Sequence, residues 1–475
     1  MTNYRWVICG MLFLATTVNY MDRQVLSLLN TNYIAKEFHW DNDDYGTITA
    51  FFSLFYAFIS LFAGKFIDKM GTKKGYIWAI VIWSIGACLH AGCGIATCWF
   101  NGVDSIEALR AIDKTAQMGL FGLTMSVWLF IACRMILAIG ESGNFPAAIK
   151  VTAEYFPKKD RALATSIFNA GASIGALIAP LTIPALADAF GWEMAFIIIG
   201  AIGFIWAGLW VFLYTAPAKS NFVNAAELAY IESDKAEEEA PKAEATDEND
   251  FKLSLFECFK YRQTWAFIVG KLFTDGVWWF FLFWAPDYFD GLGYPVTTMT
   301  GKMLLFVLYL IVTVISIYGG YLPKFFVEKR GMNPYIGRMR AMLIFAFFPI
   351  FAMFAQPLSG ISPWIPAIII GVAGAGHQAW SANLYSTIGD MFPKSAVATI
   401  TGIGTMFGGF CSFAINKGSG VLFDYAEAQG AAFSFFGETG KPAGYMIVFC
   451  YCAVAYLIGW VIMKALVPKY KPITK

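Results

Sequence analysis

Six charged residues lie inside long apolar stretches of the sequence, where an unpaired charge is expensive. They are Asp22, Arg23, Arg134, Glu141, Lys271 and Asp275. Ionisable groups in such surroundings usually face a cavity, a substrate or one another. This set offers two chemistries: carboxyl groups that take up and release a proton, and cations that hold an organic anion.

Asp22 and Arg23 are neighbours near the end of the first apolar stretch. On a helix their side chains point in directions about 100° apart. The planar guanidinium group of Arg23 can therefore bind a substrate carboxylate while Asp22 faces another helix. The alternative is an arginine that reaches to the membrane surface.

Arg134 and Glu141 are two helical turns apart and therefore share a face. Gly140, Ser142 and Gly143 beside the glutamate would let another helix approach closely. A desolvated glutamate is a candidate proton carrier, and a static buried ion pair with Arg134 is the alternative.

Lys271 and Asp275 are four residues apart, so they also share a helix face, and Trp278, Trp279 and Trp284 follow them. Aromatic rings suit the apolar faces of a sugar, and the ionic pair could contact a second polar group of the substrate. Against this, the pair can simply neutralise itself, and tryptophan is common in membrane helices.

A later apolar stretch contains the polar side chains His377, Gln378 and Asn383. Because lipid satisfies no hydrogen bond, we expect these side chains to face a cavity. A helix–helix hydrogen bond is an equally good interpretation of His377.

The composition of the chain predicts the kind of element that positions these residues. The 475 residues are 58% hydrophobic and only 14% charged, whereas soluble domains carry about 25% charged residues. This argues against a disordered chain, a nucleic-acid binder, a disulfide scaffold and an ordinary soluble enzyme. We predict an all-α membrane protein with twelve transmembrane helices, each of about 20 residues. The expected spans are 6–28, 46–66, 76–98, 123–149, 163–187, 193–215, 264–287, 301–320, 339–356, 362–389, 396–417 and 443–466.

Most of the 34 lysines and arginines fall on one side of this topology. Positively charged loops stay in the cytoplasm, which predicts that both termini are cytoplasmic. No cleavable signal peptide is evident, because the first apolar stretch is long and contains Asp22 and Arg23.

The chain is predicted to consist of an N-terminal six-helix bundle (1–215), a polar cytoplasmic linker (216–262) and a C-terminal six-helix bundle (263–475). The bundles share a repeat: EYFPK at 154–158 and ALAT at 162–165 recur as DMFPK at 390–394 and AVAT at 396–399. Parallel six-helix repeats with a substrate site between the halves are typical of one large transporter class.

The loop after the second span contains glycine, aspartate and lysines at fixed spacing. These residues are Gly64, Asp68, Lys69, Gly71, Lys73 and Lys74. The pattern resembles the loop signature of the major facilitator superfamily. Its glycines would allow a tight turn and close packing, and its aspartate could pair with nearby cations as a conformational latch. The equivalent second-half loop, 319–324, lacks the aspartate.

Within that superfamily the chain resembles the anion:cation symporter branch, and is most similar to bacterial hexuronate transporters. The resemblance covers nearly the whole chain. It rests on Tyr56 eight positions before Gly64, on Glu141 five before Pro146, on FPK at 156–158, WEMAFII at 192–198, GYLP at 320–323 and HQA at 377–379. It implies proton-coupled uptake of a sugar acid such as glucuronate or galacturonate by alternating access.

The resemblance also implies roles for individual residues. Asp22 and Glu141 look like the protonation pair, and Arg134 like their charge partner. The substrate-binding candidates are Tyr20, Arg23, Tyr56, Asn144, Lys271, Asp275, Trp278, Trp279, His377, Gln378 and Asn383. No catalytic residue, metal ligand or cofactor is expected, and the driving ion is expected to be H+.

Two departures limit the resemblance. Lys271 and Asp275 stand where hexuronate transporters tend to have Arg and Glu, a shorter acidic arm that could change the preferred sugar. Residues 99–122 and 421–442 form longer outer segments than the family leads us to expect.

The expected partners are a small anionic sugar acid and the lipid bilayer, with no nucleic acid, and we expect a monomer in a bacterial inner membrane. Three other functions stay open: transport of another organic anion (aldonate, aldarate, or organic phosphate by exchange), efflux of lipophilic compounds, and a membrane sensor that does not transport. A membrane enzyme has less support still, because no nucleophile arrangement or cofactor motif is present.

Overall fold

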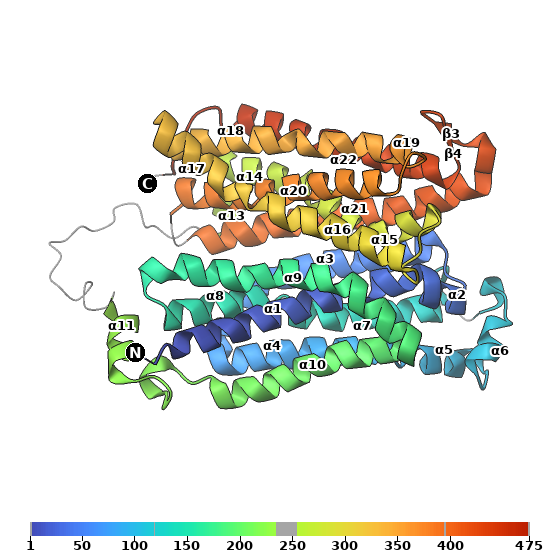
Figure 1. Cartoon of the computed structure of the whole chain (residues 1–475), viewed down its shortest axis with the longest axis horizontal. Helices are drawn as coiled ribbons and strands as arrows, with labels where there is room; N and C mark the ends of the chain where they lie inside the picture. The colour runs from blue at the N-terminus through green and yellow to red at the C-terminus, as the bar shows by residue number, and fades with distance from the viewer. Residues whose placement is uncertain (1, 118, 234–253, 394–395, 474–475) are drawn as a thin grey trace. The chain divides into compact units, whose positions relative to one another are not determined.

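The computed structural model describes residues 2–117, 119–233, 254–393 and 396–473, and they are almost entirely helical (Figure 1). The most polar part of the predicted linker, 234–253, lies outside these residues.

Long helices occupy all twelve expected stretches. In the first half they are α1 (Tyr4–Leu29), α3 (Asn42–Met70), α4 (Thr72–His90), α5 (Cys93–Asn101), α7 (Met125–Glu141), α8 (Asn144–Tyr155), α9 (Lys158–Phe190) and α10 (Trp192–Leu213). In the second half they are α14 (Arg262–Leu272), α15 (Asp275–Gly291), α16 (Met299–Ser316), α17 (Tyr318–Arg330), α18 (Pro334–Ala346), α20 (Trp364–Met391), α21 (Val397–Gln429) and α22 (Lys441–Leu466).

Short elements connect them. The helical ones are η1 (Asn30–Ile34), α2 (Ala35–Phe38), α6 (Ile106–Arg110), η2 (Lys114–Ala116), η3 (Pro217–Lys219), α11 (Ala225–Ile231), α13 (Leu255–Cys258), η4 (Phe348–Phe354), α19 (Ala355–Leu358) and η6 (Gly430–Ala432). The strands are β1 (Gly119–Leu120), β2 (Leu123–Thr124), β3 (Ser434–Phe435) and β4 (Glu438–Thr439).

Among the described residues, eight helical segments are long and apolar enough to cross a membrane, or nine if α4 and α5, bent by 51°, form one span. Three more helices have the length to cross a membrane: α1, α20 and α21, with 26, 28 and 33 residues. These twelve segments coincide with the twelve predicted spans.

Several spans are interrupted, which the apolar pattern did not predict. One break separates α7 from α8 at Ser142–Gly143, directly after Glu141, and another separates α14 from α15 at Phe273–Thr274. Irregular backbone at membrane depth is tolerated only where protein or a water-filled cavity satisfies it. At the breaks, therefore, we expect the backbone to face protein or a water-filled cavity and not lipid.

The chain divides into two compact units. Unit 1 contains residues 1–26, 62–106 and 128–246, and unit 2 contains 27–61, 107–127 and 247–475. This division by contact assigns 27–61 and 107–127 to the same unit as the second half of the chain. The prediction of two six-helix bundles joined at 216–262 concerns sequence repeats and stays a prediction.

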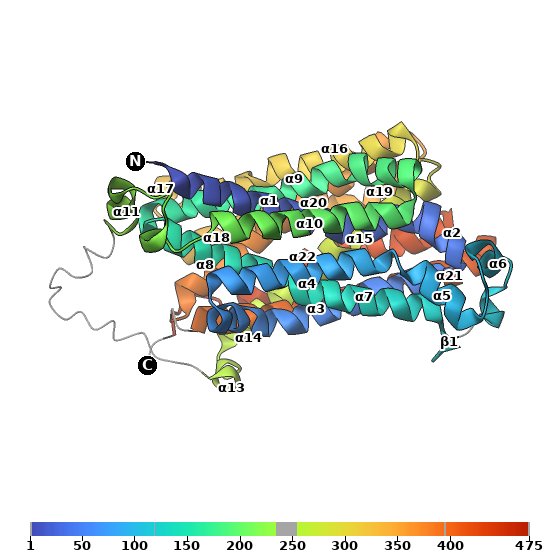
Figure 2. The same ribbon diagram turned by 90° about the horizontal axis from the view of Figure 1, so that it is seen from below.

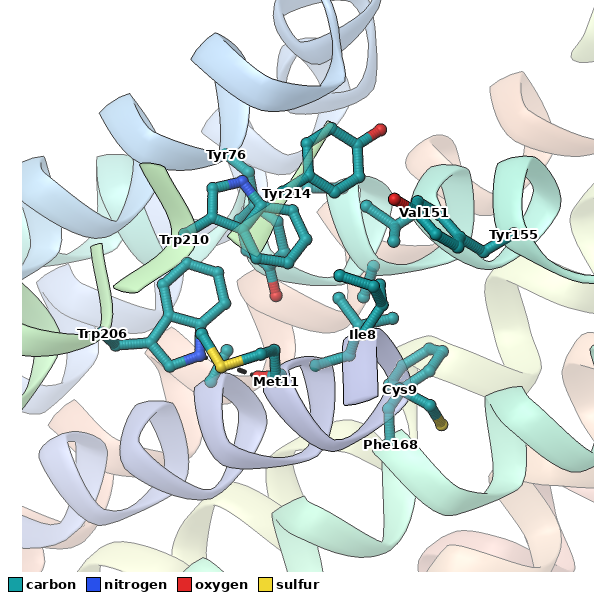
Figure 3. Packing of buried hydrophobic residues seen from close by; sticks show 14 of the residues in the cluster. Ile8, Cys9, Met11, Tyr76, Val151, Tyr155, Phe168, Trp206, Trp210 and Tyr214 are labelled. Carbon is teal, nitrogen blue, oxygen red and sulfur yellow. Dashed lines mark hydrogen bonds between the residues drawn. The ribbon is translucent and has the colours of Figure 1, made fainter. Parts of the chain in front are cut away.

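The core of unit 1 is rich in aromatic residues (Figure 3). Trp206 and Trp210 of α10 and Tyr214 directly after it stack successively, with ring centroids 4.8 and 4.4 Å apart. The Trp206 indole donates to the Met11 carbonyl at 2.8 Å, which ties α10 to α1. α4 and α10 run alongside each other (Figure 2), and a side chain at Gly200 or Gly203 would collide with α4.

In unit 2, α20 packs along α16 and also contacts α18 and α17. The first part of α3, residues 42–61, lies against α21. A Cβ at Gly46 would come within 2.6 Å of the Asn416 carbonyl oxygen, and one at Gly409 within 2.2 Å of the Ala57 Cβ. The two helices therefore approach backbone to backbone.

The two longer segments are each associated with a small antiparallel hairpin: β1–β2 straddles the end of the first, and β3–β4 lies within the second. Within unit 2 the first of them pairs with the acidic stretch before and at the start of α3. Arg110 binds Glu37 at 2.8 Å, and Lys114 contacts both Asp41 and Asp44. This segment is thus fixed by ion pairs.

Candidate functional site

The first cluster of predicted residues lies in unit 1, at the break between α7 and α8. A Cβ at Gly140 would lie 2.3 Å from the Trp83 backbone nitrogen and 2.5 Å from the Ala79 carbonyl oxygen on α4. The prediction that small residues beside Glu141 allow close helix approach is confirmed. The break places Glu141, which is 1% exposed, in the interior of unit 1.

Arg23 of α1 is the partner of Glu141. Its Nε and Nη2 both donate to Glu141 Oε2, at 3.0 and 2.7 Å, and its guanidinium lies 5.0 Å from the Tyr20 ring centroid. Arg134 donates to the Arg23 carbonyl oxygen at 3.4 Å. The sequence suggested Arg134 as the partner of Glu141, whereas the hydrogen bonds to its carboxylate come from Arg23.

Asp22 and Asn144 are buried in the same unit. Asp22 is 1% exposed, and neither carboxylate oxygen has a hydrogen-bond partner. Asn144 accepts a hydrogen bond from the Tyr76 hydroxyl at 2.7 Å and is fully buried. Asn144 therefore contacts α4 in this structure, and its predicted role in substrate binding stays a prediction.

The second cluster lies in unit 2, at the break between α14 and α15. Lys271 Nζ binds Asp275 Oδ2 at 2.7 Å and donates to the Tyr385 hydroxyl at 3.0 Å. The ammonium also lies 4.6 Å from the Tyr385 ring centroid. A Cβ at Gly408 of α21 would collide with the Asp275 carboxylate, so α21 closes over this pair.

His377 and Asn383 on α20 bind neighbouring helices. His377 Nδ1 lies 2.7 Å from the Tyr456 hydroxyl, and the His377 ring stacks on Trp278 with centroids 5.6 Å apart. Asn383 Nδ2 donates to the carbonyl oxygens of Gly319 and Ala379 at 2.9 and 2.8 Å. His377 thus makes the hydrogen bond between helices that was one of its two interpretations. Asn383 binds a backbone carbonyl group next to the break between α16 and α17.

The remaining predicted aromatic residues group around Trp279. Its ring lies edge-on to Tyr56 and Phe52 of α3, with centroids 6.1 and 6.0 Å apart. Gln378 is half-buried. Trp284 is instead buried deep in unit 2, where its indole donates to Asn416 Oδ1 at 3.0 Å.

The predicted latch lies between α3 and α4. Gly71 has a φ of +77° and links the two helices, so the turn needs a glycine at this position. Asp68 binds Lys150 of α8 at 2.8 Å, while Lys69 and Lys74 are exposed and Lys73 is half-buried. A Cβ at Gly64 would meet no atom within 4 Å, so this glycine does not serve close packing here.

Sequence reasoning missed Tyr385, Tyr456 and Tyr76, which bind predicted site residues directly. Each contact joins positions that are 68 to 114 residues apart, and neither helical period nor local spacing carries that information. The nine cysteines are all free. Within the described ranges, no three His, Cys, Asp or Glu residues are placed to hold a metal ion.

Comparison with known proteins adds family information. The sequence profile described as Major Facilitator Superfamily matches residues 12–415. The hexuronate transporter of Escherichia coli (strain K12) is 27% identical, over 84% of this chain and 83% of the relative. The galacturonate transporter of Dickeya chrysanthemi is 25% identical, over 75% and 94%. A probable galactarate/D-glucarate transporter of Escherichia coli (strain K12) is 26% identical, over 95% and 94%.

Solved structures share the fold. The crystal structure of a D-xylose-proton symporter superposes with a TM-score of 0.67 at 16% identity, covering 96% of this chain and 97% of that one. An inward-facing, occupied bacterial homologue of the human lysosomal transporter Spinster gives 0.66 at 18% identity, covering 98% and 97%.

Proposed function

Since the chain belongs to the Major Facilitator Superfamily, and is therefore a multi-pass membrane transporter rather than an enzyme, we propose that it takes up a sugar acid together with protons. The substrate we propose is a hexuronate such as glucuronate or galacturonate. Similarity to hexuronate and galacturonate transporters over most of the chain supports this choice. We place the protein in a bacterial inner membrane, with both termini in the cytoplasm, acting as a monomer by alternating access.

The observation that carries the proposal is the buried Arg23–Glu141 pair. Two hydrogen bonds donated by Arg23 go to one oxygen of Glu141, and the two side chains are 5% and 0% exposed. When a proton neutralises Glu141, the ion pair between its carboxyl group and the Arg23 guanidinium is lost. Arg23 can then bind the carboxylate of an incoming sugar acid. Proton and substrate are coupled because the proton takes the place of Arg23 at Glu141, and the substrate carboxylate takes the place of Glu141 at Arg23.

Asp22 supplies a second protonation site in this scheme. A buried carboxylate with no hydrogen-bond donor is costly in its charged form, and a bound proton removes that cost. The proposed cycle therefore begins with protonation of Asp22 and Glu141 from the outside. It continues with binding of the acid at Arg23 and ends with release of acid and protons inside.

The test is uptake of labelled glucuronate and galacturonate into proteoliposomes with an imposed inward proton gradient. The gradient should stimulate uptake by the wild type and should stimulate uptake by Glu141→Gln much less, because an amide cannot carry the proton and only Asp22 is left to do so. Glu328→Gln, which alters an exposed carboxylate on α17, is the matched control and should behave like the wild type. Undiminished gradient-driven uptake by Glu141→Gln would refute the coupling role.

One other substrate class has a specific observation in its favour. The galactarate/D-glucarate relative matches 95% of this chain, a larger share than the hexuronate relative. Galactarate and glucarate therefore belong in the same assay. Exchange of organic phosphate without any proton gradient would instead favour an exchanger, and binding of an acid without its transport would favour a sensor.

A further inference from the structure

The two small hairpins of unit 2 are closed by the same turn. Phe121–Gly122 joins β1 to β2, and Phe436–Gly437 joins β3 to β4. All four residues have a positive φ, of +54° and +78° in the first turn and +50° and +85° in the second. A hairpin loop of two residues with positive φ at both is a type I′ turn. Both longer segments that the sequence singled out therefore carry one Phe-Gly turn of this type.

Phenylalanine is an unusual residue at the first position of such a turn. The type I′ turn selects asparagine, aspartate or glycine there, because a positive φ crowds the Cβ against the backbone, and a bulky side chain with positive φ is rare. Phe121 and Phe436 are 93% and 73% exposed, so packing against the protein does little to offset this strain. Strain that is kept at an exposed position points to a function, and here it occurs twice.

The chain places both turns close to a membrane surface. β2 is followed directly by α7 at Met125, and β4 is followed after Gly440 by α22 at Lys441; both helices begin membrane-spanning segments. Phe121 and Phe436 are therefore four and five positions from the start of a span, which is at most about 14 and 18 Å along the chain. β3 and β4 also contact α22 (Figure 1). Since each headgroup layer is about 5–8 Å deep, both rings are within reach of it.

The residues beside the turns make both hairpin tips apolar. In the first hairpin, which has no charged residue, Leu120 is 55% exposed next to the tip. In the second, the Phe435 ring lies edge-on to the Phe436 ring, with centroids 4.7 Å apart. The one charged residue of this hairpin is Glu438, which accepts a hydrogen bond from Gln356 of α19 at 3.3 Å. Its carboxylate is thus bound to a neighbouring helix, and the tip presents aromatic rings.

We propose that the two Phe-Gly turns anchor these segments in the membrane surface, with the rings of Phe121 and Phe436 inserted among the lipid headgroups and the upper ends of the acyl chains. A ring in this layer leaves water, and this gain is the reason for a bulky residue at a position that suits asparagine or glycine. Because α22 crosses the membrane between β4 and the C-terminus, the second hairpin lies on the face opposite the C-terminus. The fourth and twelfth spans begin on the same face, so the first hairpin lies there too. The inference needs only the membrane-spanning fold and is independent of the proposed substrate.

The first experiment locates the tips. Phe121→Cys and Phe436→Cys proteins are labelled with a thiol-reactive fluorophore and reconstituted into phosphatidylcholine vesicles that contain a lipid with a nitroxide near the top of its acyl chain. Ala111→Cys and Ala428→Cys, at exposed positions of the same two segments, are the controls, and labelled wild-type protein gives the background from the native cysteines. The nitroxide should quench the tip labels several-fold more than the control labels, and aqueous iodide should quench them less. Equal quenching at tips and controls overturns the inference. Protection of the tips from both quenchers would indicate a protein partner or a second copy of the chain, and also overturns it.

The second experiment separates anchoring from turn formation. Phe121→Asn and Phe436→Asn install a residue that the type I′ turn favours. If phenylalanine served the turn alone, these variants would exchange the backbone hydrogens of their hairpins more slowly than the wild type in lipid nanodiscs. Anchoring predicts the opposite, several-fold faster exchange, because the tip is no longer held in the membrane surface. Phe121→Trp and Phe436→Trp keep an aromatic ring and should keep the wild-type rate. Slower or unchanged exchange in the asparagine variants overturns the inference, whereas sugar-acid uptake by the wild type tests the proposed function separately.

Discussion

In the proposed cycle, Arg23 links the binding of the anion to the binding of the proton. Two of its N–H groups already converge on a single Glu141 oxygen, and Tyr20 lies against its guanidinium. An arginine suits this position because its fork can pass from a protein carboxylate to a substrate carboxylate without losing its charge.

Replacing Arg23 with lysine should weaken substrate binding about tenfold or more, because an ammonium cannot give the two directed bonds of the guanidinium. The measurement is the dissociation constant of glucuronate for purified protein, from calorimetry or from ligand-induced thermal stabilisation. Arg262→Lys, at the first residue of α14, serves as the control. An unchanged dissociation constant for Arg23→Lys would exclude Arg23 as the anion site.

The sequence identifies the charged site residues and leaves most of their partners undetermined. Charges are rare inside apolar spans, so Asp22 and Glu141 are visible at once, and the Lys271–Asp275 pair follows from four-residue spacing. By contrast, the choice of Arg23 over Arg134 as the hydrogen-bonding partner of Glu141 depends on how α1 approaches α7. That is a long-range property which periodicity does not encode.

At the scale of elements, the approach of α7 to α4 decides where Glu141 can lie. Gly140→Ala would place a Cβ 2.3 Å from the Trp83 backbone nitrogen, and overpacking of this kind costs about 1–3 kcal/mol. Gly208→Ala on α10 is the matched control, because a Cβ there meets nothing within 4 Å. Thermal unfolding in detergent should show a lower midpoint for Gly140→Ala only, and equal midpoints would mean that the helices can separate without cost.

The spans themselves were predictable from hydrophobic length, and their interruptions were not. Ser142–Gly143 and Phe273–Thr274 interrupt stretches whose overall length and hydropathy predict a single span each. Lipid would strongly disfavour such breaks, so they depend on neighbouring helices that the local sequence does not specify.

A short helix of the linker, α11, binds the beginning of α1. Glu227 accepts hydrogen bonds from the backbone nitrogens of Tyr4 and Arg5 at 3.0 and 3.1 Å, and from Arg5 Nη1 at 3.1 Å. It therefore satisfies amides at the start of α1 that lack intrahelical partners. Burial alone would raise the pKa of Glu227, but the hydrogen bonds from Thr2 and the two amides outweigh it and hold that pKa below its usual value.

Glu227→Gln should lower the stability of unit 1 by about 2 kcal/mol, because neutral hydrogen bonds replace charge-assisted ones around Arg5. Since the folded-state pKa is depressed, the contribution of Glu227 is present above about pH 4.5 and is lost as the pH falls through the folded value. Thermal unfolding followed from pH 7 down to about pH 3 should therefore show a smaller loss on acidification in the variant than in the wild type. Parallel curves would show that Glu227 is not stabilised as the charged form.

At the scale of the whole molecule, transport requires some contacts to open and close. In unit 2, the start of α3 contacts the last part of α21, although the two segments lie more than 350 residues apart in the sequence. Asp424 accepts from the Asn42 backbone nitrogen at 2.9 Å and from the Asp43 backbone nitrogen at 2.6 Å, and Lys417 donates to Thr47 Oγ1 at 2.8 Å besides binding Asp43. In this conformation the two helices are held together at that end.

If alternating access separates α3 from α21, loss of the Lys417–Asp43 pair should favour the separated state. Thr47, which is 3% exposed, becomes a reporter when replaced by cysteine. Thr47→Cys should react slowly with a membrane-impermeant maleimide and several-fold faster when combined with Asp43→Asn, since a partly exposed ion pair contributes about 1 kcal/mol. Wild-type protein without the new cysteine gives the background labelling.

The charge exchange Asp43→Lys/Lys417→Asp should restore slow labelling, because it re-forms the pair with opposite polarity. Fast labelling in the exchanged protein would show that the side-chain volumes, and not the charges, hold α3 on α21.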